Sequence, residues 1–195
     1  MRLSLKTTAL VALAAVVLGI LGYQEHRAHA GLGMPTPSAL DLRPRFSLTG
    51  TDGRRVSDAD LRGRPVLVTF GRVACGGPCQ NLLGQEAAVL DELGAKGRKA
   101  AFLFVTLDPN RDTPDRLARF VGDIDPRLEG LRGTPAAVAA AAGAFRFEHD
   151  AGEPSPGFAV MTYLLGPQGR LRQILPDGMK APGIAALVEG MIDEG

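Results

Sequence analysis

The sequence predicts an α/β fold with a central mixed sheet, an N-terminal β-hairpin and helices on both faces. An apolar strand, a helix and a second apolar strand follow one another between residues 65 and 107, and one hairpin lies on each side of this unit. A strand–helix–strand unit with hydrophobic strands implies parallel pairing with both faces covered, whereas hairpins pair antiparallel. The 195 residues suit one such domain with an appendage.

The N-terminal region indicates the compartment. Arg2 and Lys6 precede an uncharged, largely apolar run at residues 7–22, which is typical of an export signal or a membrane anchor. Ala28-His29-Ala30 resembles a signal-cleavage site, so residues 1–30 are interpreted as an anchor in the inner membrane or as a cleaved signal that leaves a soluble form. Both alternatives place the domain outside the cytoplasm, on the periplasmic side.

Periodicity and turn residues predict the remaining elements. Residues 31–44 are rich in proline and are interpreted as a tether to a domain at residues 45–195. The expected elements are a hairpin at 46–56, a buried strand at 66–70, a helix at 80–93, a strand at 99–107, helices at 113–121 and 136–144, a short strand at 145–147, a hairpin of 158–165 with 170–175, and a closing helix at 184–191.

Cys75 and Cys79 are the two cysteines of the chain. Cys75 is expected in the turn after the buried strand, and Cys79 at the start of the next helix. Residues four apart share a helical face, and the free N–H groups at a helix N-terminus favour thiolates, so this spacing predicts a reactive thiol pair. The alternative is a static disulfide or a pair of core residues, but a bridge across so short a loop gains little entropy.

The composition argues against one class of partner. The net charge is +1 with mixed signs, tryptophan is absent, and aromatic side chains are few. Nucleic-acid binding needs a basic patch or aromatic side chains on which bases stack. We therefore expect no nucleic acid among the partners.

Five motifs in chain order resemble the SCO/SenC family. They lie at residues 46–53, 61–71, 75–79, 106–114 and 163–169, and the resemblance runs from Arg45 to the end of the chain. It implies a membrane-tethered, thioredoxin-like three-layer fold that assists assembly of the copper centre of cytochrome c oxidase. The implied partner is a protein client with cysteines, either a cytochrome oxidase subunit or a copper-handling protein.

The resemblance also implies copper ligands, namely the two cysteines and one histidine. Phe158 stands at the position of that histidine, and Gln80 replaces the family's usual proline after the second cysteine. Two thiolates can hold Cu(I), whereas imidazole would help to retain Cu(II). We therefore expect Cys75 and Cys79 to be the ligands of any copper, as Cu(I), with weak binding of Cu(II).

Other side chains could replace the missing histidine. His149 lies in a polar loop and could swing toward the cysteines, but a loop histidine is more often solvated. Met161 offers a thioether, although a methionine in a buried strand is usually core packing. His26 and His29 lie beside the N-terminal anchor.

The loop at residues 108–114 follows the second apolar strand. The carboxyl ends of parallel strands carry the sites of open α/β sheets, so we expect this loop beside the cysteines. Asp108 and Asp112 are expected to cap turns, with Arg111 paired to a carboxylate, so that the loop holds the cysteine loop. The alternative is that Asp108 tunes the thiol pKa values or receives a partner.

Three functions fit these features. In the first, the protein is a thiol–disulfide oxidoreductase in which Cys75 attacks a client disulfide and Cys79 resolves the mixed disulfide. In the second, it is a Cu(I) chaperone that uses the same two sulfurs. In the third, it is a binding or sensing module without turnover. A peroxidase is disfavoured, because Arg72 occupies the place of the threonine that peroxiredoxins have three residues before their cysteine.

Overall fold

The computed structural model describes residues 42–147, 160–176 and 178–193. Within these ranges the strands are β1 (Ser47–Gly50), β2 (Arg55–Ser57), β3 (Val66–Gly71), β4 (Ala101–Thr106), β5 (Glu129–Arg132), β6 (Met161–Leu165) and β7 (Leu171–Leu175). The helices are α2 (Gly77–Leu93), α3 (Pro114–Gly122), α4 (Pro135–Ala144) and α5 (Ala181–Asp193), with short 3₁₀ helices η2 (Val73–Cys75) and η3 (Gly94–Lys99).

These strands form one mixed sheet in the order β2-β1-β5-β4-β3-β6-β7. The central strands β3 and β4 are parallel, β4 pairs parallel with β5, and β6 pairs antiparallel with β3. Both predicted hairpins are present, as β1 with β2 and β6 with β7. The predicted strand–helix–strand unit and the three-layer, thioredoxin-like α/β fold are therefore confirmed.

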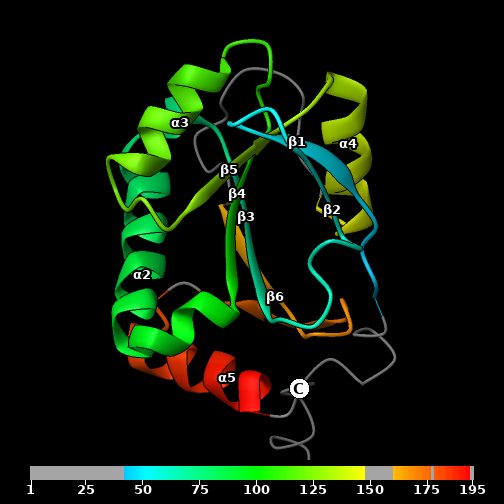
Figure 1. Ribbon diagram of the computed structural model, residues 1–195. Coiled ribbons are helices and arrows are strands. Elements are labelled where there is room, and N and C mark those ends of the chain that lie inside the picture. Colours follow the sequence, from blue (N-terminus) through cyan, green and yellow to red (C-terminus); the bar gives the residue numbers. More distant parts are fainter. Residues whose placement is uncertain (1–41, 148–159, 177, 194–195) are drawn as a thin grey trace, which may run out of the picture. The chain divides into compact units, whose positions relative to one another are not determined.

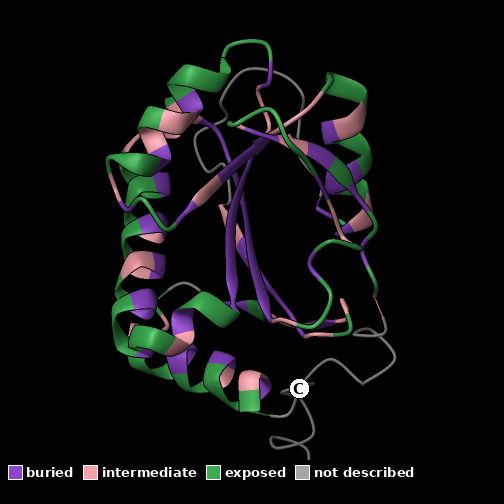
Figure 2. Cartoon of the chain, in the orientation of Figure 1, coloured by how far each residue is buried: buried purple, intermediate pink, exposed green. Residues whose placement is uncertain are grey.

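The sheet separates two apolar cores. Every residue of β3 and β4 is buried (Figure 2). Alternate side chains of a strand point to opposite faces of the sheet. On one face lie α2, α3 and α5, and on the other lies α4 (Figure 1). The α4 side contains the aromatic cluster of Phe70, Phe145, Phe147 and Tyr163, whose ring centroids lie 5.1–6.5 Å apart. The α2 side contains Cys79.

The helix starts follow their capping residues. The Thr113 hydroxyl accepts a hydrogen bond from the Arg116 amide at 3.3 Å, and the Thr134 hydroxyl accepts one from the Ala137 amide at 3.1 Å. A proline follows each cap and fixes the first helical φ. Helix α2 begins at Gly77, three residues before the predicted start, so Cys79 lies in its first turn.

The predicted strand at residues 145–147 is wrong. Phe145 ends α4, Arg146 has a left-handed φ of 54°, and the Phe147 amide donates to the Ala142 carbonyl at 2.9 Å. This left-handed residue closes the helix terminus, and both phenylalanines turn into the aromatic cluster. The apolar–polar–apolar pattern of Phe145, Arg146 and Phe147 therefore reflects this helix terminus and not a strand.

Leu42, which lies within the predicted tether at residues 31–44, packs on the fold. The Leu42 carbonyl accepts a hydrogen bond from the Leu171 amide at 2.7 Å, and Leu42 packs against the core on the α4 side. Across the residues that the structure describes, no helix has the length and apolar character needed to cross a bilayer. The predicted anchor at residues 1–30 lies outside the described residues.

Candidate functional site

Cys75 and Cys79 form a disulfide at the carboxyl end of β3. Their Cα atoms lie 5.9 Å apart, with Cys75 at the end of η2 and Cys79 in the first turn of α2. The spacing therefore brings the two sulfurs together, as the sequence predicts. Cys75 is partly exposed, whereas Cys79 is completely buried, so a partner can reach the first sulfur more easily.

Gly71 provides the space for the Cys79 sulfur. A Cβ atom at this position would lie 2.7 Å from Cys79 Sγ and 2.7 Å from Phe104 Cε2. Contacts this short require neighbouring atoms to move, and both neighbours are packed in the core. Only glycine lets the end of β3 approach the sulfur so closely.

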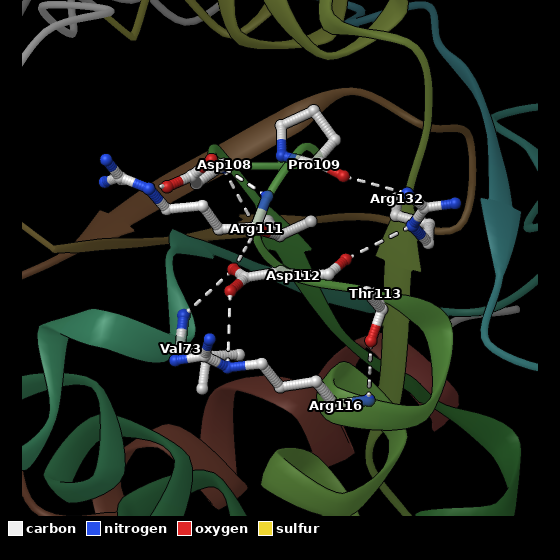
Figure 3. Close-up of polar contacts among 9 residues, drawn as sticks. Val73, Asp108, Pro109, Arg111, Asp112, Thr113, Arg116 and Arg132 are labelled. Atoms are coloured by element: carbon white, nitrogen blue, oxygen red, sulfur yellow. Dashed lines mark hydrogen bonds and ion pairs between the residues drawn. The ribbon is translucent and has the colours of Figure 1, made fainter.

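The buried carboxylate of Asp112 connects the cysteine turn to the loop after β4 (Figure 3). Its Oδ2 accepts hydrogen bonds from the Val73 amide at 3.0 Å and from the Thr106 hydroxyl at 2.5 Å. Arg116 Nε lies 4.0 Å from Oδ1. Because Val73 begins η2, this carboxylate positions the short helix that ends at Cys75.

Asp108 and Arg132 make further contacts that hold the same loop (Figure 3). Asp108 accepts a hydrogen bond from the Arg111 amide at 3.3 Å, and its Oδ2 lies 3.6 Å from Arg111 Nη1. From β5, Arg132 donates to the Pro109 carbonyl at 2.8 Å and to the Asp112 carbonyl at 3.3 Å. The loop and the cysteine turn are therefore neighbours. The residues of the loop hold it against the cysteine turn, as the sequence predicts. Arg132 was not predicted.

Glu86 forms a buried polar cluster with two threonines from the sheet. Its side chain is 2% exposed, and its Oε1 accepts hydrogen bonds from the hydroxyls of Thr69 and, at 3.5 Å, of Thr162. Its Oε2 has no hydrogen-bond partner among the described residues. Burial raises the pKa of Glu86 to about 8. The hydrogen bonds from the two hydroxyl groups lower the pKa, but they offset only part of this effect.

Sequence reasoning missed this cluster, although one signal was present. Cys79, Leu83, Glu86 and Leu90 recur at helical spacing and are all buried on one face of α2. A glutamate among apolar residues at this spacing is unusual, because an unpaired charge in a core is costly. Such a position indicates a side chain that is neutral in the folded protein.

The raised pKa of Glu86 makes the stability of the fold depend on pH. Between the ordinary pKa of 4.5 and about 8, the folded protein binds a proton that the unfolded chain has released. We therefore expect the free energy of unfolding to fall as the pH rises through this window, by about 3 to 5 kcal/mol. Urea unfolding at several pH values measures this, and Glu86→Gln should remove most of the decline. An equal decline in the variant would contradict the assignment.

The residues proposed to replace the family's histidine have different outcomes. Met161 is partly buried against the core on the α4 side, where the Tyr163 hydroxyl donates to its sulfur at 3.6 Å. Its packing supports the core role. His26, His29 and His149 lie outside the described residues, as does Phe158. No cluster of three or more metal-ligating histidine, cysteine, aspartate or glutamate side chains occurs in the described part of the chain.

Comparisons with known proteins agree with this fold and site. The family model described as SCO1/SenC matches residues 34–193. Protein SenC of Rhodobacter capsulatus is 33% identical over 181 residues, which cover 86% of this chain and 82% of SenC. The human mitochondrial SCO1 homologue is 30% identical, and the match covers 73% of this chain and half of that protein.

Solved structures show the same similarity. Copper-bound ScoI of Bradyrhizobium japonicum superimposes with a TM-score of 0.68 at 28% identity, covering 77% of this chain and 99% of that chain. Yeast Sco1 superimposes with a TM-score of 0.69 at 24% identity, covering 80% of this chain and 99% of that chain. This similarity shows that the two proteins share a fold.

Proposed function

Since the chain belongs to the SCO/SenC family, whose members take part in assembling the copper centre of cytochrome c oxidase, we propose that it reduces client cysteines during that assembly through Cys75 and Cys79. The observation that carries the proposal is the unequal burial of two bonded sulfurs. Cys75 is partly exposed at the end of η2, and Cys79 is buried beneath it. An exchange in two steps needs one accessible sulfur and one sheltered sulfur.

The reaction follows from this arrangement. In the reduced protein, the Cys75 thiolate attacks one sulfur of a client disulfide and expels the other as a thiolate. The Cys79 thiolate then attacks Cys75 Sγ, which forms the disulfide of this structure and releases the second client thiolate. Two electrons pass to the client, and the two protons of the cysteine pair end on its thiols.

The setting of this reaction is part of the proposal. The client is a protein with cysteines, either a cytochrome oxidase subunit or a copper-handling protein. The reaction takes place on the periplasmic side, with residues 1–30 as the anchor or the export signal. In an oxidising compartment the spent disulfide must be reduced again by a separate dithiol protein.

A Cu(I) chaperone is the second candidate, and the same two sulfurs favour it. The Bradyrhizobium structure has copper bound, and two thiolates held within one turn fit the preference of Cu(I) for soft ligands. Because Phe158 replaces the family's histidine, this candidate predicts strong binding of Cu(I) and weak binding of Cu(II).

The test uses the reduced full chain in mild detergent and a client peptide with one internal disulfide. Wild-type protein should reduce the peptide at least about 100-fold faster than Cys75→Ser, because the variant lacks the attacking thiolate. Cys79→Ser should accumulate a mixed disulfide that mass spectrometry detects. Anaerobic copper titration of the same samples decides between the candidates.

Each outcome has a distinct meaning. Peptide reduction without tight Cu(I) binding supports the reductant. Tight Cu(I) binding that is lost in the double serine variant, without peptide reduction, replaces the reductant with the chaperone. If wild type and the double variant behave alike in both assays, neither role holds.

A further inference from the structure

The buried position of Cys79 creates a need for a proton. When a reductant thiolate attacks Cys75 Sγ, the disulfide opens and Cys79 Sγ leaves with a negative charge. The Cys79 side chain is 0% exposed, and it lies in the apolar core beside Leu83 and Phe104. A thiolate is poorly stabilised in such surroundings, so the sulfur must take up a proton that water cannot deliver directly.

Glu86 lies beneath this sulfur on the same faces of the helix and the sheet. It follows Cys79 by seven residues, two turns along the buried face of α2. Its Oε1 contacts Thr69, while Cys79 Sγ lies against Gly71, two residues further along β3. Alternate strand residues on one face are about 7 Å apart, so the carboxyl group and the sulfur lie over neighbouring positions of this face of β3.

No ionisable side chain among the described residues lines the surroundings of the carboxyl group. The side chains around it come from α2, β3, β6, β7 and α5, and they are all uncharged: Leu82, Gln85, Leu67, Thr69, Thr162, Leu175 and Ile184. Glu86, whose Oε2 has no hydrogen-bond partner among the described residues, lines a small pocket that reaches the exposed Pro176. Burial raises the pKa of Glu86 to about 8, so the group carries its proton at neutral pH.

We propose that Glu86 is the proton donor for the buried Cys79 sulfur when the disulfide is reduced. The reductant thiolate bonds to Cys75 Sγ, the bond between the two protein sulfurs breaks, and the Cys79 thiolate receives the proton of the Glu86 carboxyl group through one intervening water molecule. Glu86 becomes a carboxylate and regains a proton from solvent through the pocket that it lines. The inference rests on the proposed function, because only a pair that cycles must be reduced repeatedly.

The experiment follows the reduction of the oxidised full chain by dithiothreitol from about pH 6 to about pH 9.5. Each rate is divided by the concentration of dithiothreitol thiolate. For wild type, the resulting rate constant should fall about tenfold or more with a midpoint near the pKa of Glu86, about 8. For Glu86→Gln it should be constant and equal to the low value of wild type at high pH.

Two more variants complete the design. Glu92→Gln removes an exposed glutamate of the same helix and should keep the wild-type profile. Glu86→Asp retains an acid and should restore a pH-dependent profile with a shifted midpoint. A wild-type rate constant that does not change across this pH range overturns the proposal, even if Glu86→Gln does not fold.

The result is independent of any client. Dithiothreitol reduces the disulfide whether or not the protein acts on a partner. The role of Glu86 as proton donor can therefore be disproved while the peptide assay still supports the reductant role. The reverse result, a pH-dependent reduction without peptide turnover, would keep the donor and remove the reductant role.

Discussion

Gly71→Ala is expected to destabilise the oxidised protein by about 3 kcal/mol or more, at the upper end of overpacking effects. The added methyl group would lie 2.7 Å from Cys79 Sγ and 2.7–2.8 Å from two atoms of the Phe104 ring. The ring is packed in the core and the sulfur is bonded to Cys75, so neither can move away easily. Urea unfolding of the oxidised protein measures the loss.

Two glycines of α2 provide matched controls. A Cβ at Gly77 or at Gly84 would meet no atom within 4 Å. Gly77→Ala should change stability little, and Gly84→Ala should stabilise the helix by about 0.5 to 1 kcal/mol, because alanine favours a helix interior. If Gly71→Ala were as mild as these two substitutions, the close approach of β3 to the sulfur would be disproved.

Asp112→Ala is expected to lower the free energy of unfolding by about 2 to 4 kcal/mol. The Val73 amide and the Thr106 hydroxyl both donate to this carboxylate, and the substitution leaves one partly buried and one buried donor without their acceptor. Because Val73 starts η2, the turn that ends at Cys75 should also become less ordered. Amide hydrogen exchange at Val73 should accelerate at least about tenfold.

Asp123→Asn is the control for this substitution. Asp123 is exposed at the end of α3, so its replacement should change the free energy of unfolding by less than about 0.5 kcal/mol. Unchanged exchange at Val73 in Asp112→Ala would show that the carboxylate does not hold the cysteine turn.

The sequence alone predicts those elements whose residues form a clear local pattern of apolar and turn-forming positions. The strand at 66–70 and the helix after it are marked by apolar runs between turn residues, and they place both cysteines correctly. Strand β5 has no such pattern, because only Gly130 and Leu131 of its four residues are buried. Its position depends on pairing with β4 and β1, which are distant in sequence.

The same distinction applies to the candidate site. The position of the 108–114 loop beside the cysteines follows from the topology of parallel strands, which the sequence indicates. The individual partners do not follow from it. Thr69 meets Thr162 because β3 and β6 pair in one particular register, and Glu86 meets both because α2 crosses that pair of strands. Contacts of this kind depend on the tertiary structure.

The division of the core by the sheet has a consequence for how this chain can evolve. The aromatic cluster packs against α4, while the cysteine pair and Glu86 lie on the opposite face. Free-energy effects of substitutions at separated sites without shared partners add almost independently. Phe145 and Phe147, which follow α4 and are not next to Thr69 or Gly71 in the chain, can therefore be exchanged for other apolar residues with little epistasis toward the cysteine site, whereas Phe70 lies between Thr69 and Gly71 and is coupled to that site. Mutational drift should be fast on one side of the sheet and slow on the other.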